Sequence, residues 1–169
     1  MNNQKSQSLK LAKMAMLVAI SIVLVMVIHF PIFPMVAFLE YDPADIPILI
    51  GTFAFGPGAG ILLTVVVSLL QGLTVSAGSG VYGIIMHILA TTTRATTAGL
   101  IYRKHKTNKT AIIGLVGGTI AMAVVMFFAN MVITPMFTGM PLEAIMQLMP
   151  FIIAFNVVKA GINSIVTFI

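Results

Sequence analysis

The amino-acid sequence predicts an all-α integral membrane protein with six transmembrane helices in one compact bundle. Of its 169 residues, 59% are hydrophobic and only 8% are charged, whereas a soluble domain carries about 25% charged residues. The mean hydropathy is +1.10, and the apolar residues form long runs separated by short segments rich in proline, glycine or charge. A hydrocarbon core of ~30 Å needs ~20 helical residues per span. Residues 1–169 therefore have room for about six spans in a single membrane domain.

The first helix is expected over about residues 9–28. This apolar run is too long for the core of a signal peptide and lacks a small-residue cleavage site, so we expect it to be retained. Ala12, Ala15 and Ala19 recur at spacings of three and four and therefore share one face. Small residues at such spacings let another helix approach closely in lipid. Spacing alone leaves open whether this face packs inside the bundle or against another protein.

An acidic connection, residues 38–47, follows the first helix. It holds three of the four acidic residues of the chain, Glu40, Asp42 and Asp45. Asp45 is expected to be the N-cap of a short second helix over about residues 45–55, because a side-chain carboxylate can accept from the free N–H groups of a first turn. Glu40 is expected to be solvated.

Four further helices are expected from the apolar runs and their breakers. A turn rich in glycine and proline separates the second helix from the third, a glycine- and serine-rich loop separates the third from the fourth, and Pro135 stops the fifth. The sequence leaves open whether the C-terminus is truncated, because the last helix ends without a polar tail. The expected bounds are about 61–71, 81–102, 110–133 and 150–169.

The distribution of lysine and arginine predicts that both termini lie on the cytoplasmic side. Seven of the nine basic residues fall in the N-terminal segment or in residues 103–109, after the fourth helix. All four acidic residues fall on the opposite side. This is the positive-inside pattern of membrane proteins, so the net charge of +5 reflects topology rather than binding to nucleic acid.

Two basic residues, Arg94 and Lys159, lie inside predicted helices. A cation at the centre of a membrane helix costs ~2.5–3.5 kcal/mol on insertion scales, so such residues usually face a cavity or a partner. Lys159 shares a helix face with Asn156 and Asn163. This polar stripe indicates either an inward-facing ligand site or hydrogen bonds between helices. Arg94 lies in a threonine-rich run, and the sequence assigns it no role.

Other polar side chains lie at a similar depth in the outer halves of their helices. His87 and Asn130, together with Gln71 and Ser76, could complete a polar pocket near the outer surface, although a lone histidine is as often a packing residue. The chain has no cysteine, phosphate-binding loop, metalloprotease motif, serine-hydrolase motif or histidine pair with metal spacing. We therefore expect no metal, no cofactor and no catalysis. These groups suit hydrogen bonding to a small neutral or weakly anionic molecule.

Several blocks, taken in order, resemble the substrate-binding S component of an energy-coupling factor (ECF) vitamin transporter, in particular its riboflavin-type branch. The resemblance covers nearly the whole chain. Its motifs are individually weak but occur together with six expected spans. They are the alanine face of the first helix, Tyr41-Asp42-Pro43-Ala44-Asp45-Ile46-Pro47, Phe55-Gly56-Pro57-x-Ala59-Gly60, Asn130 with Pro135, and Phe155-Asn156-x-x-Lys159.

The resemblance implies a protein that binds a vitamin from outside and is not itself an enzyme. A transmembrane T component and two cytosolic ATPases of the ABC type would be its partners, with Ala12, Ala15 and Ala19 docking on the T component. ATP hydrolysis in those partners would make the S component topple in the membrane and release its cargo inside. Asn156 and Lys159 are the pocket residues that the resemblance implies. With Asn130, His87 and Gln71 they form the expected substrate-binding set, beneath an outward-facing gate that includes Asp42 and Asp45.

The chain departs from the riboflavin-type pattern where it has Glu40, Leu70-Gln71 and His87. These departures favour a smaller ring, a hydroxymethylpyrimidine or a pyridoxine-like precursor, with riboflavin as the alternative. Two functions of other classes stay open. One is a self-sufficient secondary transporter driven by an ion gradient, and the other is an assembly subunit without a ligand.

Overall fold

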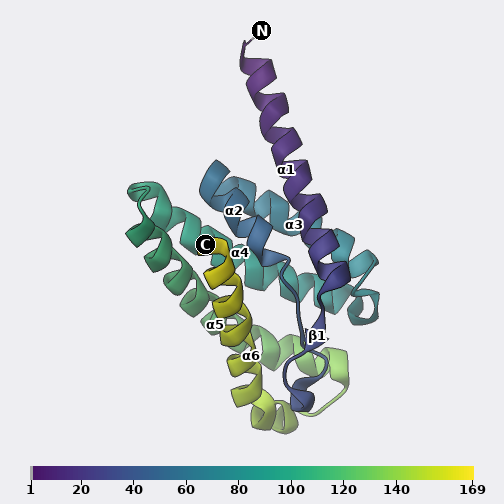
Figure 1. Ribbon diagram of the computed structural model, residues 1–169. Helices are drawn as coiled ribbons and strands as arrows, with labels where there is room; N and C mark the ends of the chain where they lie inside the picture. The colour runs from purple at the N-terminus through teal and green to yellow at the C-terminus, as the bar shows by residue number, and fades with distance from the viewer. Residues whose placement is uncertain (1) are drawn as a thin grey trace.

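A computed structural model describes residues 2–169, and within this range it contains six α-helices joined by short connections (Figure 1). Two short 3-10 helices, η1 (Pro34–Val36) and η2 (Ala77–Ser79), and a two-stranded antiparallel ribbon, β1 (Phe30–Pro31) with β2 (Glu40–Tyr41), lie in the connections. The expected all-helical class is confirmed. The helices are α1 (Asn2–Val27), α2 (Asp45–Phe55), α3 (Pro57–Leu73), α4 (Gly80–Lys104), α5 (Asn108–Thr138) and α6 (Leu142–Phe168).

The helices differ in their capacity to cross a membrane. By length and composition, α1, α5 and α6 are each sufficient to span a bilayer, while α3 and α4 qualify only as a pair that is bent by 93°. Helix α2 has 11 residues and rises about 16 Å, roughly half of a ~30 Å hydrocarbon core. The expectation that each of six helices is a full span is therefore met only in part. The apolar pattern predicts a span for short runs and long runs alike, although only the long ones can cross a bilayer.

Prolines interrupt the helices less than the sequence suggested. Helix α5 continues through Pro135 and ends where Gly139 adopts a left-handed conformation, with φ 72°. Helix α6 begins eight residues earlier than expected and runs through Pro150. The predicted stop at Pro135 and start at Pro150 are wrong, because neighbouring groups can accommodate a proline inside a membrane helix. At Gly56-Pro57 the two residue types together end one helix and begin the next.

Helix α1 packs on α2 and α3 with one face only. Met14, Ser21 and Val25 on that face are buried, and the Ser21 hydroxyl donates to the Ala44 carbonyl oxygen at 3.1 Å. The opposite face is exposed, and the N-terminal end of α1 extends beyond the other helices (Figure 1). Internal packing of the alanine face is thereby excluded, since that face, made of Ala12, Ala15 and Ala19, lies on the exposed side.

Helices α4 and α5 approach each other closely where glycines lie on α5. A Cβ atom on Gly114 would lie 2.9 Å from the Ala98 carbonyl oxygen, and one on Gly118 would lie 2.7 Å from the Arg94 carbonyl oxygen. Small residues spaced by four let helix backbones approach in this way. The contact fixes the depth of α4 against α5, and with it the position of the polar residues that α4 carries.

We predict that Gly118→Ala and Gly114→Ala destabilise the protein by about 1–3 kcal/mol each, because the added methyl group meets backbone atoms that cannot move aside. Gly117→Ala is the matched control. A Cβ atom there meets only the flexible end of the Ile101 side chain, at 3.1 Å. Thermal unfolding in detergent measures the difference. Equal melting temperatures for the three variants would contradict this account of the α4–α5 contact.

Candidate functional site

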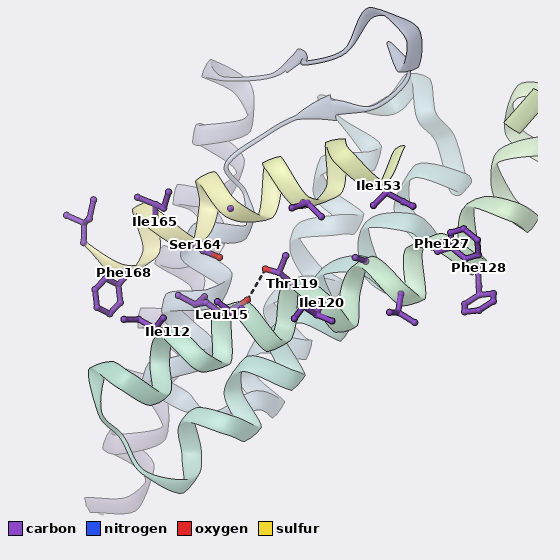
Figure 2. A pocket seen from close by; sticks show the side chains of 16 residues that line it. Ile112, Leu115, Thr119, Ile120, Phe127, Phe128, Ile153, Ser164, Ile165 and Phe168 are labelled. Carbon is purple, nitrogen blue, oxygen red and sulfur yellow. Dashed lines mark hydrogen bonds between the residues drawn. The ribbon is translucent and has the colours of Figure 1, made fainter. Parts of the chain in front are cut away.

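An apolar groove of about 960 Å³ lies between α5 and α6 (Figure 2). Its walls carry side chains such as Ile112, Phe128 and Ile165. The Thr119 hydroxyl donates to the Leu115 carbonyl oxygen, and Ser164 accepts from Arg94. Both hydroxyl groups of the groove are therefore engaged already. A site for a water-soluble ligand needs a few convergent polar groups, so this groove suits lipid chains better than a vitamin.

A smaller cavity of about 150 Å³ has the opposite character. It lies between the acidic connection, the C-terminal end of α3, the N-terminal half of α4, and the middle of α5 and α6. One side is apolar and rich in methionine, with Met86, Met122, Met126 and Phe155. The polar side chains of its lining are Glu40, Asp42, Asp45, Ser68, Gln71, Ser76, Ser79, His87, Thr91, Asn156 and Lys159. Most of the residues that the sequence selected are brought together here.

Asp42 is the centre of the first polar cluster. Its Oδ2 atom accepts from Lys159 Nζ at 2.7 Å and from Gln71 Nε2 at 3.2 Å, and its Oδ1 atom accepts from the Ala44 backbone N–H at 3.1 Å. The last bond is an Asx turn, in which a side chain shapes its own backbone. Asp42 is only 4% exposed. It therefore both forms a turn and joins the acidic connection to α3 and α6.

Tyr41 and Asn163 reinforce this junction. Asn163 is fully buried; its amide donates to the Asp42 carbonyl oxygen at 3.2 Å, and its Oδ1 atom accepts from the Tyr41 hydroxyl at 3.0 Å. Burial raises the pKa of the Tyr41 phenol, so this group stays a neutral donor. Asn163 therefore belongs to the hydrogen bonds that hold α6 to the connection, as one of the two interpretations of the polar stripe on α6 expected.

Asp45 and Arg94 form the second cluster. Arg94 is fully buried, and its Nη1 atom donates to Asp45 Oδ2 at 3.0 Å. Its Nη2 atom donates to the Ala160 carbonyl oxygen at 2.6 Å and to Ser164 Oγ at 2.7 Å. The Thr91 hydroxyl donates to Asp45 Oδ1 at 2.7 Å. One guanidinium group thus joins α4 to α2 and α6.

The predicted capping role of Asp45 is wrong. Helix α2 has Ala44 as its N-cap, without a side-chain cap, and Asp45 is the first helical residue. Its carboxylate is directed to Arg94 and Thr91 on α4 instead, because a buried guanidinium group must have a counter-charge. The sequence held a signal for this pair. A lone arginine deep in a helix needs a carboxylate, and few carboxylates are present in this chain.

Of the remaining predicted ligand residues, two line the cavity and one does not. His87 lines the cavity, with Nδ1 2.7 Å from Ser68 Oγ. Asn156 also lines it, although its amide N–H group donates to the Ile152 carbonyl oxygen of its own helix. Asn130 does not line the cavity. It is fully buried, donates to the Met126 carbonyl oxygen and accepts from Thr134, so both ends of its amide are satisfied within α5.

The electrostatics of the cavity are balanced. Asp42 pairs with Lys159, Asp45 pairs with Arg94, and Glu40 is exposed at the rim. No cluster of three or more His, Cys, Asp or Glu that could hold a metal occurs in residues 2–169. The arrangement offers hydrogen bonds and an apolar surface to a small molecule. Ser68, which sequence reasoning missed, precedes Gln71 by three residues and so shares its helix face.

Comparisons with known proteins indicate the family of this chain. A family model described as the substrate-specific component of ECF transporters matches residues 9–169. The riboflavin transporter RibU of Staphylococcus aureus is 36% identical over 168 residues, which cover 95% of this chain and 87% of that protein. The riboflavin transporter FmnP of Bacillus subtilis is 30% identical over 131 residues, which cover 76% of this chain and 68% of that protein.

A solved structure gives the same result at the level of the fold. It is described as the structure and mechanism of the S component of a bacterial ECF transporter. It superposes with a TM-score of 0.82 at 35% sequence identity and covers 95% of this chain and 92% of that one.

We predict that Arg94→Met destabilises the protein by about 3–5 kcal/mol, because it leaves Asp45 as an uncompensated buried charge. Adding Asp45→Asn to this variant should recover a large part of the loss, since the second change removes the charge that lost its partner. Arg103→Gln is the control, because Arg103 is exposed and its loss should change little. Unfolding in detergent of wild type, Arg94→Met, Asp45→Asn, the double variant and the control gives the free energies. Additive losses in the double variant would contradict the coupling.

Proposed function

The chain belongs to the family of substrate-specific (S) components of ECF transporters, and from this premise we propose that it captures riboflavin outside the cell for ATP-driven uptake. The family makes it a multi-pass protein of the bacterial cell membrane and a non-catalytic, substrate-binding subunit. Relatives that are 30–36% identical are named riboflavin transporters. Their names support the riboflavin alternative better than the hydroxymethylpyrimidine or pyridoxine-like ligand that the sequence departures favoured.

The chemistry of the cavity supports a ligand with an apolar face and a polar edge. A flavin has a flat aromatic ring system with a polar pyrimidine edge and a hydroxylated side chain. Methionines such as Met122 and Met126 make favourable contacts with aromatic rings and adapt to their shape. The opposite side carries Asn156, Lys159 and Gln71. The apolar and polar walls of the cavity therefore support a flavin as the ligand.

The size of the cavity indicates how the ligand enters. At about 150 Å³ it is smaller than most ligand pockets, which measure ~300–1,000 Å³. The acidic connection forms one wall and is held to α6 through Asp42 and Lys159. We infer that this connection is the gate and that it opens toward the outside, with both chain termini in the cytoplasm. Residues 103–109 at the other end of the bundle carry the positive charge expected of a cytoplasmic loop.

Energy for uptake is proposed to come from partner subunits. Membership of the family implies association with the energy-coupling module of the transporter, which we take to be a T component with two ABC-type ATPases. The alanine face of α1 is the proposed docking surface. Ala12, Ala15 and Ala19 are exposed along a helix that uses its other side for packing, and small residues permit close helix contact in lipid.

The ligand proposal is tested by binding to the purified protein. Quenching of riboflavin fluorescence should show saturable binding, which an excess of hydroxymethylpyrimidine or pyridoxine should not reverse. Lys159→Met should weaken binding about tenfold or more, the equivalent of ~1.4 kcal/mol, whereas the exposed Lys104→Met should not. Binding of hydroxymethylpyrimidine or pyridoxine without binding of riboflavin would contradict the riboflavin proposal and support the smaller ring.

The docking proposal predicts that Ala15→Trp and Ala19→Trp abolish co-purification with the energy-coupling module, because a large side chain prevents close approach of another helix. Riboflavin binding by the same variants should be unchanged, since this face does not line the cavity. Ile20→Trp is the control, because Ile20 is exposed on α1 outside the alanine face. Uptake by liposomes driven by an ion gradient without ATPases would instead favour a secondary transporter.

A further inference from the structure

Two buried polar atoms on the cavity lining have no hydrogen-bond partner in the structure. They are Gln71 Oε1 and His87 Nε2. A buried polar group without a partner is costly, and native proteins leave few of them. The other polar atoms of these two side chains are hydrogen-bonded. The neighbouring donors and acceptors therefore determine whether each unpaired atom is a donor or an acceptor.

The histidine tautomer follows from Ser68. The Ser68 hydroxyl has one hydrogen, which it donates to the Thr64 carbonyl oxygen at 2.6 Å. Its 2.7 Å contact with His87 Nδ1 must therefore be a bond that the imidazole N–H donates and the hydroxyl oxygen accepts. A neutral imidazole has a single N–H group. With this hydrogen on Nδ1, the Nε2 atom of His87 presents a lone pair.

The glutamine orientation follows from Asp42. The Gln71 amide nitrogen donates to Asp42 Oδ2 at 3.2 Å and to Ser76 Oγ at 3.3 Å. A flipped amide would place Oε1 against a carboxylate oxygen, where two acceptors repel each other. Lys159 holds that carboxylate in place at 2.7 Å. The Gln71 Oε1 atom is thus fixed as an acceptor.

The charges around His87 are compatible with a neutral ring. Asp45 Oδ1 lies 3.7 Å from Nε2, beyond hydrogen-bond distance, and Asp45 is already engaged by Arg94 and Thr91. Asp42 and Lys159, the other charged groups on this wall, are paired with each other. No described donor on the protein reaches Nε2, so this atom is free to accept from a bound ligand.

Resting on the proposed function, we propose that His87 Nε2 and Gln71 Oε1 are an acceptor pair that determines specificity by receiving N–H or O–H donors of the ligand. A flavin offers such donors in two places, the imide N–H of its pyrimidine ring and the hydroxyl groups of its ribityl chain. Ligand groups that only accept, or that carry negative charge, are disfavoured at this position. The fourth-helix histidine therefore reads hydrogen-bond donors instead of serving as a packing residue.

A cycle of protein and ligand changes tests the proposal. Affinities of wild type, His87→Phe and Gln71→Met are measured for riboflavin, for 3-methylriboflavin, which lacks the imide N–H, and for lumiflavin, which lacks the ribityl hydroxyls. Removing a paired acceptor should weaken riboflavin binding about tenfold. The same variant should then no longer discriminate against the analogue that lacks the matching donor. The analogue for which discrimination is lost identifies the ligand group that donates to the removed acceptor.

Thr92→Val is the control, because the Thr92 hydroxyl is also buried without a partner but does not line the cavity, and its loss should leave affinity unchanged. Thermal unfolding checks that each variant is folded. The acceptor pair would be overturned if the loss of affinity from the protein change and the loss from the ligand change multiply for every variant and analogue. It would also be overturned if His87→Phe binds riboflavin as wild type does. Either result leaves the proposed function intact.

If wild type binds none of the three flavins, the proposed function fails instead. The acceptor pair is then judged with hydroxymethylpyrimidine, which carries an amino group and a hydroxyl group, against its form with a fully methylated amine. Loss of discrimination in His87→Phe or Gln71→Met supports the pair, and unchanged discrimination overturns it.

Discussion

Four charges in a membrane-embedded bundle, three of them buried and Lys159 half-buried, constrain this structure more than any other feature. Asp42 pairs with Lys159 and Asp45 pairs with Arg94, and each ion would be costly if it stood alone in a medium of low polarity. The two carboxylates are three residues apart in the acidic connection, while their partners lie on α6 and α4. Both pairs can form only if the acidic connection lies between α4 and α6. The cavity lies at that place, and Asp42, Asp45 and Lys159 line it.

The long helices could be predicted from composition because apolar runs are an unambiguous signal in a chain this poor in charge. Their ends were harder. Pro135 and Pro150 lie inside helices since a membrane bundle can compensate a missing N–H group, which a rule drawn from soluble proteins does not anticipate. The short α2 likewise satisfied the apolar pattern, although its length does not allow it to cross a bilayer.

For the site, sequence spacing identified Asn156 with Lys159 because they share one face of one helix. It could not identify contacts between residues far apart in the chain. Spacing gives Arg94 no role and predicts a cap for Asp45, because their pairing joins positions 49 residues apart. Asn130 was selected for its depth, but an amide can satisfy itself on its own helix, as this one does. Depth and polarity alone therefore do not distinguish a ligand contact from an internal bond.

The brevity of α2 has a consequence for the lipid around the protein. A helix of 11 residues covers about 16 Å, which is only part of the bilayer's hydrocarbon thickness, while α5 with 31 residues exceeds it. Hydrophobic mismatch costs fractions of a kcal/mol per Å and is relieved by thinning or tilt. The two helices therefore differ in the bilayer thickness that they match, α2 being too short and α5 too long. A change in bilayer thickness affects them in opposite directions.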